Sequence, residues 1–238
     1  MTGEDSARPA VAAEARQGRL TARPAHRPRS DFTAGLERLT VDGGTGGLLY
    51  VPACVPPERP APLVLLFHGA GATAQHGLNL LIDQADDAGP VLLAPNSQGR
   101  TWDLLLGGYG PDVARVDQAL AETLQRLPVD PTRLAIGGFS DGASYAVSLG
   151  LTNGNLFSHV LAFSPGFAAP ARRRGRPHVF VSHGTRDRVL PIDTCSRRLV
   201  PELRQAGYYV RYREFDGGHA VPAAIARDAV GWLRSPTA

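Results

Sequence analysis

The sequence predicts an α/β protein with one mostly parallel sheet that is covered by helices on both faces. Residues 63–67, 91–94 and 134–136 are continuous apolar runs, as expected for strands buried on both sides. Segments with helical spacing of apolar residues separate these runs, and this alternation is typical of parallel sheets. The 238 residues, 43% of them hydrophobic, can bury one sizeable core, and no internal repeat divides them. We therefore expect one globular unit.

The first expected element is a hairpin, formed by strands at residues 36–41 and 48–51 around a glycine-rich turn at 42–47. The turn does not fit a phosphate-binding loop, because a strand rather than a helix follows it. The remaining expected elements are, in order, a strand at 63–67, a helix through 78–85, a strand at 91–94, a helix at 112–127, a strand and helix across 134–146, strands at 159–163 and 178–182, a helix at 193–205, a strand at 208–214 and a helix at 222–233.

Residues 1–30 differ in composition from the rest of the chain. They contain six arginines and three acidic residues, which account for the net charge of +3, and they show no apolar periodicity. We expect a disordered or loosely docked tail before a folded domain at 31–238. The formally neutral remainder predicts no nucleic-acid-binding face. No segment fits a secretion signal or a membrane span, so a cytoplasmic protein is expected, with an organellar transit peptide as the alternative.

The two cysteines, Cys54 and Cys195, lie far apart in the sequence and in no metal-ligand spacing. We expect free thiols, with a disulfide between them as the alternative. Neither a metal nor a cofactor is expected.

The stretch at residues 134–146 predicts a strand, a sharp turn and a helix. Ser140 stands at the tip of the turn, with Gly138 two residues before it and Gly142 two residues after it. Side chains at these two glycine positions would collide in such a tight backbone. The turn therefore lifts the serine oxygen above the sheet edge and aims the free N–H groups of the helix N-terminus at whatever bonds to that oxygen.

A serine hydroxyl is a weak nucleophile, so its chemistry needs a base and an acid that orients the base. Of the seven histidines, His219 lies in a glycine-rich loop after the last strand, at the sheet edge where ligands bind. His68 and His183 also follow strands at this edge, but each precedes a glycine in a tight turn and is expected to be structural.

The acid is expected to be Asp187, which follows a strand and lies between Ser140 and His219 in the chain. Asp193 and Asp216 are the rivals. Asp193 is placed to cap a helix, and Asp216 lies so close to His219 that the loop would have to double back.

Several of these segments, taken together, resemble the α/β-hydrolase superfamily of serine esterases. They are Phe67-His68-Gly69-Ala70-Gly71, Pro111-Asp112-Val113, the run from Val129 to Gly142, His183-Gly184-Thr185-Arg186-Asp187 and Gly217-Gly218-His219. Over residues 36–234 the chain resembles the phospholipase/carboxylesterase branch and its neighbours, the feruloyl-esterase and polyhydroxyalkanoate-depolymerase-like esterases. The resemblance implies an α/β-hydrolase fold with a mostly parallel sheet, helices on both faces and no cap domain.

The resemblance also implies roles for individual residues. Ser140, Asp187 and His219 would form a catalytic triad, and the backbone N–H groups of Ala70 and Asp141 would form an oxyanion hole. The chain shows neither the export signal nor the disulfides that are common in the depolymerase relatives, which makes polymer degradation the less favoured alternative.

Substrate contacts are expected from Gly69 and Phe139, which neighbour the oxyanion hole and the nucleophile. Trp102, after the strand at 91–94, either walls the substrate pocket or packs in the core. The resemblance places a lid at residues 164–177, but this connection is too short and too polar for a helical lid, so we expect a shallow, open cleft. An open cleft buries little of a long acyl chain, which favours short-chain or aromatic esters.

The expected function is that of a serine carboxylesterase that acts on small-molecule esters through an acyl-serine intermediate. The alternatives are a polyester depolymerase-like, lysophospholipase or thioesterase activity, and a non-catalytic binding protein with the same fold. The sequence leaves open whether the protein is a monomer or a dimer.

Overall fold

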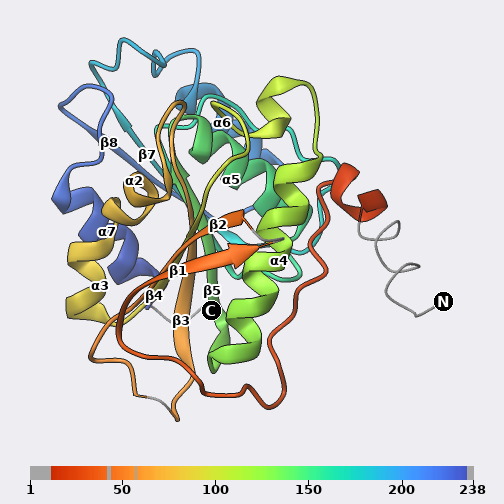
Figure 1. The fold of residues 1–238 in the computed structure, drawn as a ribbon. Helices are drawn as coiled ribbons and strands as arrows, with labels where there is room; N and C mark the ends of the chain where they lie inside the picture. The colour runs from red at the N-terminus through yellow and green to blue at the C-terminus, as the bar shows by residue number, and fades with distance from the viewer. Residues whose placement is uncertain (1–11, 42–43, 57, 235–238) are drawn as a thin grey trace.

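The computed structural model describes residues 12–41, 44–56 and 58–234, which are built around one twisted β-sheet (Figure 1). Within these residues the sheet has eight strands: β1 (Gly35–Val41), β2 (Gly44–Val51), β3 (Ala61–Phe67), β4 (Val91–Pro95), β5 (Val129–Phe139), β6 (His159–Phe163), β7 (His178–Gly184) and β8 (Val210–Phe215). Their order across the sheet is β1-β2-β4-β3-β5-β6-β7-β8. β2 pairs antiparallel with both β1 and β4, whereas all pairs from β4 to β8 are parallel.

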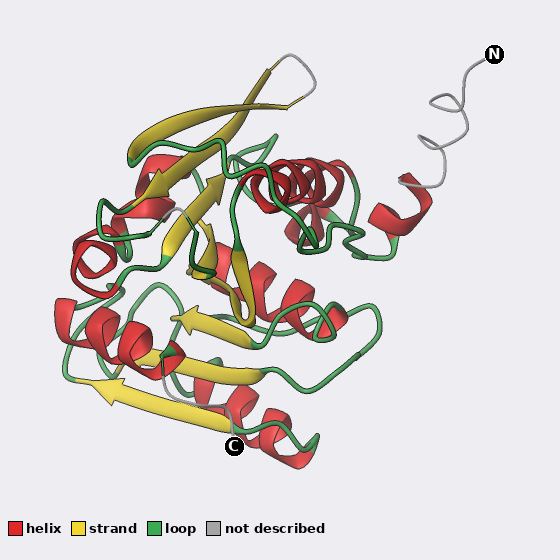
Figure 2. Cartoon of the chain, turned by 90° about the horizontal axis from the view of Figure 1, so that it is seen from below, coloured by secondary structure: helices red, strands yellow, loops and turns green. Residues whose placement is uncertain are grey.

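Helices cover both faces of this sheet. The named helices of the described chain are α2 (Ala74–Asn79), α3 (Ile82–Ala88), α4 (Pro111–Arg126), α5 (Asp141–Thr152), α6 (Ser196–Gln205), α7 (Ala223–Leu233) and the short 3-10 helix η1 (Asp103–Leu106). Helices α4, α5 and α6 lie on one face, and α2, α3 and α7 lie on the other (Figures 1 and 2). The predicted mostly parallel sheet between two helical layers is therefore confirmed.

Each face of the sheet has its own apolar core, and β3 contributes to both. Leu63, Leu65 and Phe67 pack with α4 and α5, while Val64 and Leu66 pack with α2, α3 and α7. Successive side chains of a strand point to opposite faces, so a strand buried on both sides must be apolar throughout. This requirement explains the uninterrupted apolar run from which β3 was predicted.

Element boundaries differ from the predicted ones in a few places. The helix expected through residues 78–85 is divided into α2 and α3, because the backbone of Leu81 leaves the helical region (φ −136°, ψ 1°). Strand β5 begins earlier than expected, at Val129, where it pairs with Ala61 of β3. The expected hairpin at β1 and β2 is present, although residues 42 and 43 of its turn lie outside the described residues.

The structure differs from the expected disordered or loosely docked tail over residues 12–30, which pack beside α4 (Figure 1). Leu20 is fully buried in the core, and its N–H donates to Asn153 Oδ1 at 3.0 Å. The buried carboxylate of Asp117 accepts hydrogen bonds from the N–H groups of Thr21 and Ala22, each at 2.8 Å. These bonds fix an extended segment that has no amphipathic period. Residues 1–11 lie outside the described part of the chain.

Three other expectations concern thiols, metals and membranes. Cys54 is exposed and Cys195 is buried, and both are free thiols. Among the described residues, no group of three or more histidine, cysteine or acidic side chains is placed to hold a metal ion. No helix in the same residues is long and apolar enough to cross a membrane.

Docking of the N-terminal segment predicts that Leu20→Ala destabilises the whole domain. Replacing a fully buried leucine by alanine should lower the free energy of unfolding by about 2–4 kcal/mol, because the change leaves a cavity. Denaturant and thermal unfolding measure the effect. The matched control is Gln17→Ala at a nearby exposed position, which should change stability by less than about 0.5 kcal/mol. Equal stability of the two variants would show that the segment does not pack in solution.

Candidate active site

Ser140 lies at the turn between β5 and α5, at the carboxyl end of the parallel strands. Its backbone has φ 58° and ψ −122°, a conformation that residues other than glycine rarely adopt. The turn is held by hydrogen bonds on both sides, since Ser140 donates its N–H to Phe163 O at 3.0 Å and its carbonyl accepts from Ala143 at 2.9 Å. A strained residue that is fixed in this way is typical of a functional site.

The two glycines that flank Ser140 are required by close packing, as predicted. A Cβ atom at Gly142 would lie 2.3 Å from the carbonyl oxygen of Phe67 at the end of β3. A Cβ atom at Gly138 would lie 2.5 Å from the carbonyl oxygen of Gly142. The absence of both side chains lets the loop after β3 lie directly beside Ser140.

The structure joins Ser140, His219 and Asp187 in one chain of hydrogen bonds. His219 Nε2 lies 2.9 Å from Ser140 Oγ, and His219 Nδ1 lies 2.6 Å from Asp187 Oδ2. The other oxygen of Asp187 accepts from the N–H groups of Val189 and Leu190, each at 2.9 Å. In the neutral ring, an Nδ1–H that donates to the carboxylate leaves Nε2 as the acceptor facing the serine hydroxyl.

The same hydrogen bonds determine the charge of Asp187. Burial raises the pKa of this carboxyl group, but hydrogen bonds from His219, Leu190 and Val189 outweigh burial and hold the pKa below its usual value. The group is therefore a carboxylate at neutral pH.

Two loops bring these residues together. Asp187 follows β7 and His219 follows β8, and the loops are joined where Arg186 N donates to Gly217 O at 2.9 Å. Thr185 N donates to Phe215 O, also at 2.9 Å, which continues the β7–β8 pairing into the loops. Parallel pairing of β7 and β8 thus places the acid and the histidine on the same edge of the sheet as Ser140.

The rival histidines bond to groups other than Ser140, and His183 Nε2 also lies 3.2 Å from Asp187 Oδ2. His183 is fully buried, with Nδ1 2.6 Å from Ser196 Oγ and Nε2 2.8 Å from Leu190 O. Burial lowers the pKa of His183, so its ring is neutral. His68 is engaged in a similar way, since one nitrogen lies 2.8 Å from Gly69 O and the other accepts from the N–H of Ser97.

The rival acids also have other partners. Asp193 forms an ion pair with Arg197 at 2.8 Å, and Asp216 forms one with Arg186 at 3.1 Å. Neither carboxylate contacts His219.

Ser140 and His219 open into a pocket of about 330 Å³. The pocket is lined by His68, Gly69, Ala70, Ala72, His76, Leu80, Phe139, Ser140, Val189 and His219. Gly69 and Phe139 thus line the pocket, as expected for substrate contacts. The ring centroids of Phe139 and His219 are 4.5 Å apart. Among the described residues, no aspartate, glutamate or arginine lines this pocket.

Trp102 does not line the pocket, and the core alternative is the right one. The indole is fully buried and stacks on Tyr145, with ring centroids 5.0 Å apart and planes inclined by 14°. Its Nε1 donates to the carbonyl oxygen of His68 at 2.9 Å. Trp102 therefore holds the loop after β3 from the core side. Its position in the sequence did not reveal this role.

Five pocket residues were not predicted as site residues, namely His68, Ala72, His76, Leu80 and Val189. His76 and Leu80 are four residues apart, which is the spacing of one helical face, so they could have been grouped once α2 was placed beside the site. Val189 follows Asp187 by two residues and remains 65% exposed, so nothing in the sequence distinguishes it from an ordinary surface residue.

The two amides expected to form an oxyanion hole lie on either side of Ser140. Ala70 belongs to the loop after β3, and Asp141 is the first residue of α5. In the described chain neither N–H donates to a backbone or side-chain acceptor, whereas the next amide along the loop, Gly71 N, donates to Arg100 O at 2.6 Å. Both amides therefore stay candidates for the oxyanion hole.

The connection between β6 and β7 carries no helix, as predicted for an open site. All of residues 164–177 are described, and none is helical. The loop lies against α5, where Gly166 N donates to Ser144 Oγ at 2.9 Å and Ala169 N donates to Ser148 Oγ at 2.8 Å. These bonds hold the loop to the protein surface beside α5.

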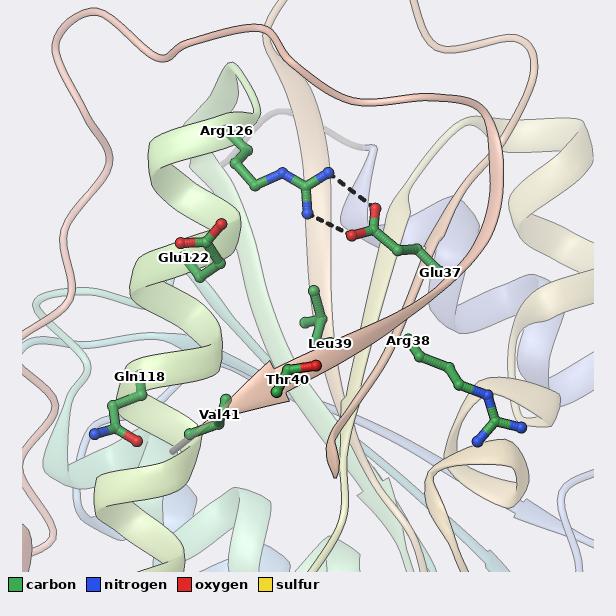
Figure 3. A pocket seen from close by; sticks show the side chains of 8 residues that line it. All are labelled: Glu37, Arg38, Leu39, Thr40, Val41, Gln118, Glu122 and Arg126. Carbon is green, nitrogen blue, oxygen red and sulfur yellow. Dashed lines mark hydrogen bonds and ion pairs between the residues drawn. The ribbon is translucent and has the colours of Figure 1, made fainter. Parts of the chain in front are cut away.

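A second hollow, of about 440 Å³, lies between β1 and α4 and shares no residue with the Ser140 pocket (Figure 3). Across the hollow, the guanidinium of Arg126 forms a bidentate ion pair with the carboxylate of Glu37, with N–O distances of 2.7 and 2.9 Å. No serine, cysteine or histidine among the described residues lines this hollow. The described lining of this hollow therefore offers no nucleophile of the kind that Ser140 provides.

The fold is that of an α/β-hydrolase. A model of the phospholipase/carboxylesterase family matches residues 111–224. The predicted resemblance to serine esterases of this branch is thereby confirmed. No curated protein matches the sequence of the chain.

Solved structures show the same fold. Esterase PE8 has 24% sequence identity and a TM-score of 0.64, with 79% of this chain and 97% of that chain covered. The fluorophosphonate-binding serine hydrolase FphF of Staphylococcus aureus has 12% identity and a TM-score of 0.67, covering 84% and 98%. A phospholipase/carboxylesterase from Dyadobacter fermentans has 20% identity and a TM-score of 0.58, covering 80% and 97%.

Close packing at the turn predicts that Gly142→Ala disrupts the site. The added methyl group cannot be accommodated 2.3 Å from a backbone oxygen, so β3 and α5 must separate. We expect a loss of about 1–3 kcal/mol in stability and a loss of esterase activity far beyond that of the control. The control is Gly231→Ala in α7, where an added Cβ meets no atom within 4 Å. Wild-type activity in Gly142→Ala would contradict this account of the turn.

Proposed function

We propose that the protein is a serine esterase that hydrolyses short-chain or aromatic carboxylic esters through an acyl-serine intermediate. The observation that carries this proposal is the hydrogen-bonded chain from Ser140 through His219 to Asp187 at the mouth of a largely apolar pocket. The match to the phospholipase/carboxylesterase family supports an ester rather than another substrate class.

In the first step His219 Nε2 accepts the proton of Ser140 as Oγ attacks the ester carbonyl. The carbonyl oxygen becomes negative, and the N–H groups of Ala70 and Asp141 are the proposed donors to it. His219 then gives its proton to the departing alcohol, which leaves an acyl group on Ser140.

In the second step water takes the place of the alcohol. His219 accepts a proton from the water, whose oxygen attacks the acyl carbonyl, and the same two N–H groups stabilise the second oxyanion. Ser140 then leaves with the proton that His219 returns, and the acid is released. Throughout, Asp187 holds the Nδ1–H tautomer and stabilises the imidazolium that forms twice in the cycle.

The pocket favours apolar acyl groups of limited length. Its aliphatic and aromatic walls include Leu80, Phe139 and Val189, which offer apolar contact to such a group. The part of a longer chain that extends beyond the pocket would stay in water and gain little free energy.

The nucleophile assignment predicts that Ser140→Ala abolishes ester hydrolysis and labelling by a fluorophosphonate probe. The loss should reach about 10³-fold or more, because removal of a triad member leaves only binding and oxyanion stabilisation. His219→Ala should behave alike, and Asp187→Asn should lose less. The control Ser158→Ala, at the amino end of the sheet, should keep both activity and labelling. Wild-type protein that is neither active nor labelled would point to a binding protein instead.

The open pocket predicts that kcat/KM is highest for short acyl chains. In a series of nitrophenyl esters from acetyl to palmitoyl, each added methylene gains up to about 0.8 kcal/mol while it is buried and almost nothing beyond the pocket. We therefore expect kcat/KM to level off and then fall, with no increase when the substrate forms micelles. A steady rise to long chains, or a jump at the micellar concentration, would favour a lysophospholipase or lipase.

A further inference from the structure

The loop at residues 96–103, after β4, contacts both sides of the proposed oxyanion hole. Trp102 Nε1 donates to His68 O at 2.9 Å, and Arg100 O accepts from Gly71 N at 2.6 Å. These two bonds hold the backbone on either side of Ala70. The loop is thus the support on which one of the two proposed oxyanion donors rests.

The same loop reaches the other donor through a side chain. Thr101 Oγ1 donates to Asp141 Oδ2 at 2.7 Å, and both residues are half-buried. In the part of the chain that the structure describes, Asp141 has no ion-pair partner and no other side-chain hydrogen bond. The position of this carboxylate therefore depends on Thr101.

Thr101 itself is held between fixed points. The buried carboxylate of Asp112 accepts from Gln98 N at 2.8 Å and from Asp103 N at 2.9 Å, one on each side of Thr101. Trp102, the next residue, is fully buried. The hydroxyl of Thr101 is thus presented to Asp141 by a rigid part of the loop.

The position of the Asp141 carboxylate matters for the proposed reaction. A carboxylate in the first turn of a helix is attracted to the free N–H groups and to the positive end of the helix dipole. An oxyanion on the substrate would use the same N–H groups, and two negative charges at one helix end repel each other. In the structure the carboxylate is bound to Thr101 and does not line the pocket.

We propose that Thr101 is a positioning residue, which holds the Asp141 carboxylate away from the oxyanion and keeps the N-terminus of α5 available to it. This inference rests on the proposed esterase function. A hydrogen bond that only stabilised the fold would matter regardless of the charge at residue 141. If Thr101 positions the carboxylate, the effect of losing its hydroxyl must depend on that negative charge.

The test is a double-mutant cycle with Thr101→Val, which removes the hydroxyl at almost constant shape, and Asp141→Asn, which removes the charge and keeps the backbone N–H. In the wild-type background Thr101→Val should lower kcat for nitrophenyl acetate about tenfold and change KM less than about twofold, since the repulsion develops in the transition state. In the Asp141→Asn background the same change should cost less than about twofold. Thr101→Ser keeps the donor and should restore most of the activity.

The matched control is Thr132→Val, because Thr132 Oγ1 donates to Asp130 Oδ1 at 2.6 Å at the opposite end of β5. This change should leave kcat unaltered. Melting temperatures of all variants are measured beside the kinetics. Equal losses of kcat from Thr101→Val in both backgrounds, or no loss at all, would overturn the inference while wild-type turnover still supports the esterase. Wild-type protein without turnover or fluorophosphonate labelling would overturn the proposed function itself.

Discussion

The site depends on one contact, between the carbonyl oxygens at the end of β3 and the glycines on either side of Ser140. Phe67 of β3 pairs with Gly138 of β5, and Gly142 then passes within van der Waals reach of Phe67 O because it has no side chain. The contact fixes the angle between β5 and α5 and brings the β3 loop beside the serine. The strained backbone of Ser140 is stable only because its neighbours are held so closely on both sides.

The positions of Asp187 and His219 follow from the sheet rather than from the turn. Each comes from a loop after a parallel strand, and the pairing of β7 with β8 keeps these loops adjacent. Hydroxyl groups of α5 have a comparable role on the other side, since Ser144 and Ser148 hold the β6–β7 loop against the helix. These side-chain-to-backbone bonds fix the course of the β6–β7 loop beside α5.

Much of this could be predicted from the sequence, because the signals were local. Strands buried on both faces must be apolar, and residues that follow parallel strands meet at one edge, so the sequence alone allows Ser140, Asp187 and His219 to be grouped. Trp102 could not be placed, because its role depends on Tyr145 and His68, which are distant in sequence. The docking of Leu20 was missed for the same reason: its partner Asn153 and the neighbouring Asp117 show no pattern that points to an extended segment.

The N-terminal segment has a further consequence for how the chain folds. The bond from Leu20 to Asn153 spans 133 residues, and the bonds from Thr21 to Asp117 span 96. Contacts of such long range gain free energy only after the intervening chain has been ordered, because the entropy of closing a long loop must be overcome first. We therefore expect this segment to dock late in folding, on a surface that α4 and α5 have already formed.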